Sequence, residues 1–292
     1  MSSALARLWI AAIDATHGWP QAARTRLANA IGTLLWLIVF PRRRIAETNL
    51  RICFPRMPAT ERARLARSVF RNIARATLDH SVLACAARDE IERYVQVDGE
   101  VRLTDPANRP LILIAPHFVG LDAGGLRINT LARGVSVYAR QSNASWDDWL
   151  LRIRRRFSDP LLLTRGGRDL RVAIRAIEDG LPFYYLPDMD NGAAQSIFAP
   201  FFGVPAATIP MVSRLARIAK AKVMLAVTEM TADGYRLHLE PPLADFPGGS
   251  VEEDTARVNR EIERWVLRMN DQYLWTHRRF KTRPPGAPSL YG

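Results

Sequence analysis

The residues of this chain best suited to acid–base chemistry are His117 and Asp122. His117 follows the apolar run 111–115 and Pro116, and Asp122 stands five residues further on, where the next helix is expected to start. Ligands of α/β sheets bind at the carboxyl ends of strands. A carboxylate beside an imidazole fixes its tautomer and stabilises the imidazolium that forms when the ring removes a proton. The spacing predicts a His117–Asp122 dyad acting as general base, although a histidine that only caps or packs locally gives the same pattern.

A second acidic pair, Asp188 and Asp190, follows the apolar run 183–186. Three interpretations are open: a metal-bound diphosphate site, as in some sugar-nucleotide transferases; a substrate-positioning loop without metal; or a turn, which Asp-Asn-Gly favours. The histidines and cysteines are scattered without metal-ligand spacing, so neither a zinc site nor a disulfide framework is expected. They are His17, His80, His117, His238, His277, Cys53 and Cys85.

Three arginines, Arg140, Arg165 and Arg168, stand at or just beyond the ends of expected strands. In a parallel sheet they face one rim, where guanidinium groups can hold a phosphate or an oxyanion in bidentate fashion. The fingerprints of common nucleotide sites and of the serine nucleophile elbow are missing from the sequence. The polar residues at this rim therefore suggest acid–base chemistry on an anionic substrate.

The elements that must position these residues alternate along the chain after Tyr94. A buried parallel strand reads as a continuous apolar run, and alternation of such runs with helices indicates a parallel sheet. We therefore predict an α/β fold, with a largely parallel central sheet flanked by helices, behind an N-terminal helical section. The expected strands are 111–115, 135–138, 161–163, 183–186, 223–227 and an antiparallel or edge strand at 235–240; the expected helices are 123–133, 146–157, 168–179, 209–219 and 252–270.

The N-terminal section is expected to form helices at 4–16, 21–40 and 60–90. Residues 28–40 carry no charge and are followed by Pro41 and three arginines, Arg42 to Arg44. A helix of this length covers about 20 Å, less than the roughly 30 Å hydrocarbon core of a bilayer. The pattern suits a helix that spans or dips into a membrane with its basic end among anionic headgroups, and also a core helix with a solvated charged end. We predict membrane-associated helices over 1–40 and a catalytic domain over 41–292.

The overall charge indicates an anionic partner. The chain has 292 residues with 41 Lys+Arg against 29 Asp+Glu, a net charge of +12. Such a balance suits nucleic acid, an anionic membrane or an acidic protein, and a GC-rich genome also produces it. Nucleic-acid binding requires exposed aromatics interleaved with arginines, whereas Trp36 and Phe40 lie in the apolar run. Nucleic acid is therefore disfavoured. A non-catalytic membrane scaffold, in which His117 is dispensable, remains the alternative to an enzyme.

Five blocks in order along the chain resemble the lipid A biosynthesis late acyltransferases, the lauroyl/myristoyl transferases of Gram-negative bacteria within the lysophospholipid acyltransferase superfamily. The second block is the H-x4-D motif of His117 and Asp122; many close members carry Glu at the latter position. H-x4-D alone is a weak signal, and the five blocks together are a strong one. They are residues 42–50 with 53–55, 115–122, 186–190, 198–208 and 273–284.

The resemblance implies a glycerolipid acyltransferase-like fold and transfer of a fatty acyl group from acyl carrier protein to a hydroxyl of a phosphorylated lipid A precursor, Kdo-lipid IVA, in lipopolysaccharide biosynthesis. His117 would be the base and Asp122 its orienting carboxylate, with direct acyl transfer and no cofactor or metal. Arg156 and Arg168 are candidates for the oxyanion. The implied location is the cytoplasmic face of the inner membrane, on anionic lipids. Lysophosphatidic acid and an ornithine lipid are the alternative acceptors.

Overall fold

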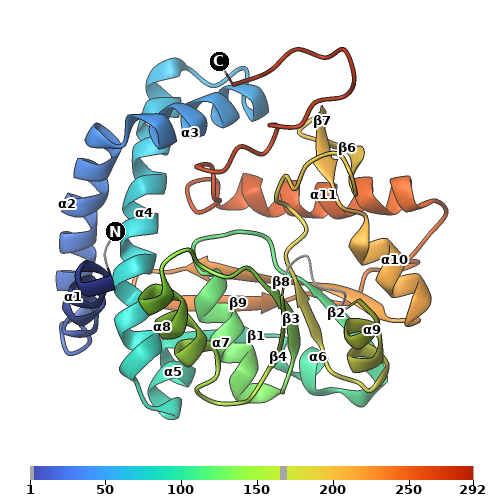
Figure 1. Ribbon diagram of the computed structural model, residues 1–292, viewed down its shortest axis with the longest axis horizontal. Coiled ribbons are helices and arrows are strands. Elements are labelled where there is room, and N and C mark those ends of the chain that lie inside the picture. The colour runs from blue at the N-terminus through green and yellow to red at the C-terminus, as the bar shows by residue number, and fades with distance from the viewer. Residues whose placement is uncertain (1–2, 165–169, 292) are drawn as a thin grey trace.

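The computed structural model describes residues 3–164 and 170–291, and these residues contain a central sheet of seven strands (Figure 1). The strand order is β1-β9-β8-β2-β5-β3-β4, and only the pairing of β8 with β9 is antiparallel. The predicted largely parallel sheet is confirmed. The strands are β1 Val95–Asp98, β2 Leu111–Ile114, β3 Val135–Tyr138, β4 Leu161–Thr164, β5 Phe183–Tyr185, β8 Lys222–Met230 and β9 Tyr235–Leu239.

Helices cover both faces of the sheet, as the continuous apolar strands require. Ile112 and Ile114 of β2 point into one core with α9, α10 and α11. Leu111 and Leu113 point into a second core with α7 and α8. At Gly124 of α7 a Cβ atom would lie 1.9 Å from Thr228 Oγ1 of β8, so glycine permits this close approach. These helices are α7 Leu121–Leu131, α8 Ala144–Arg154, α9 Leu170–Glu178, α10 Met211–Ile218 and α11 Val251–Arg268.

The N-terminal section packs around the long helix α4: α2 runs along it on the outer side, α3 crosses its upper end in Figure 1, and α1 contacts both α4 and α8. At Gly32 of α2 a Cβ atom would lie 2.5 Å from the Cα atom of Arg71 in α4, so the two backbones touch there. None of the described helices has the length and apolar content needed to cross a bilayer. The helices are α1 Ser3–Asp14, α2 Gln21–Ile38, α3 Phe40–Cys53, α4 Ala59–Cys85 and α5 Arg88–Tyr94.

Several elements differ from the expectation. The helix expected over 21–40 ends at Ile38, because Val39 leaves the helical region at φ −90° and ψ 61°. Pro41 lies in the first turn of α3, where its missing N–H costs no bond. Of the two alternatives for 235–240, the antiparallel strand is confirmed by the pairing of β9 with β8; β9 lies between β1 and β8 and is therefore not at the edge. The sequence patterns also missed β1, α6 Glu100–Thr104, and the hairpin of β6 Ile197–Phe201 and β7 Val204–Thr208.

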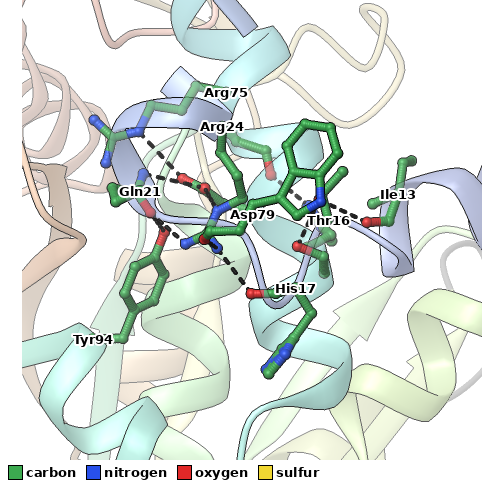
Figure 2. Close-up of polar contacts among 12 residues, drawn as sticks. Ile13, Thr16, His17, Gln21, Arg24, Arg75, Asp79 and Tyr94 are labelled. Carbon is green, nitrogen blue, oxygen red and sulfur yellow. Dashed lines mark hydrogen bonds and ion pairs between the residues drawn. The ribbon is translucent and has the colours of Figure 1, made fainter. Parts of the chain in front are cut away.

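A buried ion-pair cluster fastens the N-terminal helices to the sheet (Figure 2). Asp79 of α4 is fully buried and lies 3.4 Å from Arg24 of α2 and 3.3 Å from Arg75 of α4. Its carboxylate also accepts a hydrogen bond from the Tyr235 hydroxyl of β9 at 2.9 Å. Residues before and after position 40 thus share one buried network, while the domain boundary at that position stays a prediction.

Replacing Asp79 by Asn should lower the free energy of unfolding by roughly 3–5 kcal/mol, because two buried guanidinium groups lose the charge that compensates them. Urea unfolding followed by circular dichroism measures this change. Asp89→Asn is the control, because Asp89 pairs with Arg93 at an exposed site and should matter little. A protein with Asp79→Asn as stable as the control would contradict a stabilising role for the cluster.

Candidate active site

His117 and Asp188 lie together because their strands are neighbours. β2 and β5 pair in parallel, so their carboxyl ends reach the same edge of the sheet. His117 stands three residues after the end of β2, and Asp188 stands three residues after the end of β5. Where the two loops begin, the Ala115 amide donates a hydrogen bond to the Tyr185 carbonyl at 2.8 Å. The sheet order therefore places an imidazole beside a carboxylate at its carboxyl edge.

The Asp188 carboxylate holds His117 at two points. Asp188 Oδ1 lies 2.7 Å from His117 Nδ1, and Asp188 Oδ2 accepts the His117 backbone N–H at 2.9 Å. Asp188 is buried, whereas the His117 side chain keeps about a fifth of its surface exposed. An N–H on Nδ1 that donates to Asp188 leaves the lone pair on Nε2, and no described residue hydrogen-bonds that nitrogen. The ring is therefore set to take a proton from a substrate through Nε2.

Asp188 is ionised at neutral pH. Burial raises its pKa, but the charge of His117 and the hydrogen bonds from the His117 ring and amide outweigh burial and hold the pKa at about 2. Burial and then the charge of Asp188 raise the pKa of the Tyr273 hydroxyl, which lies in the same buried region. A fixed negative charge in this place stabilises the imidazolium that forms when His117 takes a proton.

Asp122, the expected partner of His117, binds other side chains instead. Its Oδ2 lies 3.3 Å from His80 Nε2 of α4, and its Oδ1 accepts from Arg154 Nη2 of α8 at 2.9 Å. The expected His117–Asp122 contact is thus corrected to His117–Asp188. The reason is directional: Asp122 lies in the first turn of α7, on the side that packs against α4 and α8.

His80 has an acceptor at each ring nitrogen. Nδ1 lies 2.7 Å from the Ala76 carbonyl oxygen, and Nε2 faces Asp122. Both nitrogens can donate only in the imidazolium form. Burial lowers the pKa of His80, but the hydrogen bond and the charge of Asp122 outweigh burial and raise it overall. Asp122, Arg154 and His80 therefore form a charged link between α7, α8 and α4.

The pH dependence of stability should report this link. The folded-state pKa of His80 is raised, so its contribution is fully present below 6.5 and is lost as the pH rises through the folded-state pKa. Urea unfolding over a pH series should show the free energy of unfolding falling above pH 6.5, and less steeply for His80→Gln. His17→Gln, at a partly exposed site 3.6 Å from Glu90, is the control. Equal slopes for His80→Gln and the unaltered protein would refute the charged link.

The C-terminal segment lines the other side of the His117 loop. The Leu274 amide donates to the His117 carbonyl at 2.9 Å, and the Val119 amide donates to the Gln272 carbonyl at 2.9 Å. His277 Nε2 accepts the Asp190 backbone N–H at 3.0 Å, which requires a neutral ring. Burial and then the charge of His117 lower the pKa of His277 to about 4. His277 is therefore a neutral acceptor at physiological pH.

The two carboxylates of the D-x-D pair have separate partners. Asp188 binds His117, whereas Asp190 accepts from the Gly192 amide at 3.0 Å and from the Thr282 amide and hydroxyl at 2.6 and 2.7 Å. Asp190 thus forms a turn and ties the C-terminal segment to it. Residues 3–164 and 170–291 contain no group of three or more His, Cys, Asp or Glu side chains placed to hold a metal ion.

The arginines expected at the site are distributed differently. Arg140 is largely exposed and lies 3.7 Å from Asp147. Arg156 donates to the Leu83 and Ala86 carbonyls at 2.7 and 2.6 Å, where it covers the end of α4, and this engagement argues against an oxyanion role. Arg165 and Arg168 lie outside the described residues.

Sequence reasoning gave no role to three residues near the H-x4-D motif and the D-x-D pair. They are His80, Arg154 and Tyr273. His80 lies inside the long helix α4 and Arg154 is the last residue of α8; neither belongs to a motif, so nothing local marks them. Tyr273 is the first residue of the block 273–284, and this position was the only feature of the sequence that pointed to it.

Known proteins resemble this chain over most of its length. A model of the bacterial lipid A biosynthesis acyltransferase family matches residues 2–282. The lipid A biosynthesis lauroyltransferase of Escherichia coli is 32% identical over 271 residues, which cover 91% of this chain and 88% of the relative. The palmitoleoyltransferase of that bacterium is 31% identical over 91% of this chain and 87% of its own. The lipid A biosynthesis myristoyltransferase of Escherichia coli is 27% identical over a region that covers 97% of this chain and 89% of the relative.

Proposed function

The chain belongs to the bacterial lipid A biosynthesis acyltransferase family and is an acyltransferase of lipid A biosynthesis, and on this premise we propose how it works. A fatty acyl group passes from the thioester of acyl carrier protein to a hydroxyl of a phosphorylated lipid A precursor, Kdo-lipid IVA. His117 is the general base. The observation that carries this proposal is the buried Asp188 carboxylate on His117 Nδ1, at 2.7 Å, which leaves Nε2 for the acceptor hydroxyl.

In the proposed reaction the hydroxyl oxygen attacks the thioester carbonyl carbon while its proton moves to His117 Nε2. The tetrahedral intermediate collapses, the carbon–sulfur bond breaks, and the thiolate leaves as the thiol after taking the proton from the imidazolium. The developing imidazolium is stabilised by Asp188. Arg168 or a backbone N–H is proposed as the donor to the oxyanion.

Direct transfer without an acyl-enzyme is supported by the state of the buried cysteine. Cys53 is 6% exposed, and burial together with the charge of Glu263 raises the pKa of its thiol. A protonated, buried thiol is a poor nucleophile. His117 is hydrogen-bonded to Asp188 and not to a serine or cysteine, so its role as a base toward the acceptor itself is the simpler one.

We propose that the protein lies on the cytoplasmic face of the inner membrane, with one side of its first two helices in the interface. Large apolar side chains are exposed on α1 and near the end of α2, while Ala28 and Gly32 on the opposite side of α2 are buried. Burial of an exposed apolar face and attraction of arginines to anionic headgroups favour this position together. The exposed residues are Leu5, Leu8, Trp9, Leu34, Leu37, Ile38 and Phe40.

The partners follow from charge. A chain with a net charge of +12 suits both an acidic carrier protein and a phosphorylated acceptor.

Mass spectrometry of lipid A from cells with and without the protein tests the reaction, the acceptor and the acyl length together. Loss of one acyl group from lipid A is the expected result. In a purified system, acyl carrier protein as donor and a panel of Kdo-lipid IVA, lysophosphatidic acid and ornithine lipid as acceptors should give transfer to the first alone.

A further inference from the structure

A small cavity that is open to solvent lies between the start of α3 and the C-terminal segment. Arg44, Ile45 and Thr48 of α3 line one side, and Arg278 and Tyr291 line the other. These two parts of the chain lie next to each other at the top of Figure 1. The cavity has a volume of about 210 Å³, several times the roughly 30 Å³ that one water occupies in the liquid. It has room for a phosphate group and the carbons attached to it.

The guanidinium groups at this cavity lack the partners that their neighbours have. Arg42 donates to the Thr276 carbonyl at 3.2 Å, and Arg43 pairs with Glu47 at 2.8 Å. No described residue pairs with the guanidinium of Arg44, and that of Arg278 only lies 5.8 Å from the ring centre of Tyr291.

The lining of the cavity contains two arginines and no acidic residue. Both arginines are exposed, and the described lining residues supply no counter-charge, so their guanidinium groups are free to bind an anion there. Phosphate oxygens match the paired donors of a guanidinium group.

The surroundings of the cavity indicate where that anion comes from. Phe40 also lines the cavity and is more than half exposed, as are Leu37 and Ile38 just before it. Apolar side chains beside a cationic cavity match the boundary between headgroups and acyl chains. A phosphate held by Arg44 and Arg278 would lie at headgroup level when these side chains enter the acyl region.

We propose that this cavity binds the phosphate group of an anionic membrane lipid. Arg44 and Arg278 donate to the phosphate oxygens, and Phe40 lies among the acyl chains. The inference rests on the membrane attachment proposed above and does not depend on the acyl-transfer chemistry. A bound lipid would also bridge α3 and the C-terminal segment directly beside His277, which follows Thr276 and precedes Arg278.

The test compares two double variants of equal charge in the full-length protein. Arg44→Gln with Arg278→Gln empties the cavity of its cations. Arg51→Gln with Lys281→Gln removes the same charge from exposed positions of α3 and of the C-terminal segment, outside the cavity lining. Sedimentation measures the partition of each protein onto vesicles of phosphatidylcholine, with and without phosphatidylglycerol, in the absence of acyl donor and acceptor.

The cavity variant should lose roughly 10- to 30-fold in partition onto the anionic vesicles. The control variant should lose less than about threefold, because Arg51 and Lys281 lie outside the cavity lining and attract the vesicle only through screened, long-range charge. On phosphatidylcholine alone the two should agree. Equal losses for both variants on anionic vesicles would mean diffuse attraction and would overturn the site. Thermal unfolding confirms that each variant is folded.

A third variant separates a cavity from a charged surface. Thr48→Phe fills the cavity without changing the charge, so it should weaken partition onto anionic vesicles if the phosphate enters. Unchanged partition of a folded Thr48→Phe protein would refute the proposal.

Equilibrium dialysis against inorganic phosphate, without vesicles, tests a free ion as the source of the phosphate. If the unaltered protein bound inorganic phosphate as tightly as it binds anionic vesicles, the lipid assignment would be overturned. Failure of the acyl-transfer proposal would leave all of these binding results unchanged.

Discussion

His117→Ala should lower the rate of acyl transfer by about 10²–10⁴-fold, because a positioned general base contributes that much. The acceptor hydroxyl is a poor nucleophile at neutral pH unless its proton is removed. The fold should persist, since the His117 side chain is partly exposed and its main contact is Asp188. Single-turnover transfer from acyl carrier protein to Kdo-lipid IVA, with thermal unfolding as the check on folding, measures the effect.

The matched control is His17→Ala, which removes a histidine whose ring lies 3.6 Å from Glu90. Its rate should stay near that of the unaltered protein. Near-normal turnover by a folded His117→Ala protein would remove His117 from the catalytic machinery. Absence of transfer by the unaltered protein as well would instead favour the alternative of a membrane scaffold.

Asp188→Asn should lower the maximal rate by about 10²–10⁴-fold, with a smaller change in KM. The amide of Asn keeps the size of the side chain, but it cannot stabilise the imidazolium and can favour the wrong tautomer of His117. Initial rates at saturating and limiting acceptor concentration separate the effect on the maximal rate from the effect on KM.

Asp122→Asn distinguishes the His117–Asp122 pair expected from the sequence from the His117–Asp188 pair in the structure. Because Asp122 binds His80 and Arg154, its replacement should lower the free energy of unfolding and change the rate less than Asp188→Asn does. If Asp122→Asn were the slower enzyme while Asp188→Asn kept its rate, Asp188 would lose its role as the orienting carboxylate.

The sequence alone determined the architecture around the site. Continuous apolar runs marked β2 and β8, because a strand that is buried on both faces has few polar residues. Shorter segments rich in apolar residues marked β3, β4 and β5. His117 and Asp188 were both located at the carboxyl ends of strands from the order of residues alone. Such features are local: they depend on which residues follow one another within a few positions, and a single sequence displays them.

The elements that the sequence missed depend on contacts with distant parts of the chain. β1 is a short edge strand of mixed character that forms by pairing with β9, more than a hundred residues later. α3 carries many arginines, but its buried side, with Ala46, Leu50 and Cys53, packs in the core, and Asn49 donates to the Trp275 and His277 carbonyls. The buried positions of α3 recur at helical spacing, whereas β1 leaves no periodic pattern in its residues.

Only the tertiary structure decided which carboxylate serves His117. H-x4-D brings Asp122 within five residues of His117, but its first-turn position on α7 turns the side chain toward α4 and α8. Asp188 lies 71 residues away and reaches the ring because β5 pairs with β2. Strand order is fixed by the packing of whole layers, because the residues at the end of a strand do not specify which strands pair with it. The sequence therefore placed His117 at the carboxyl edge of the sheet, and the packing of the sheet placed Asp188 beside it.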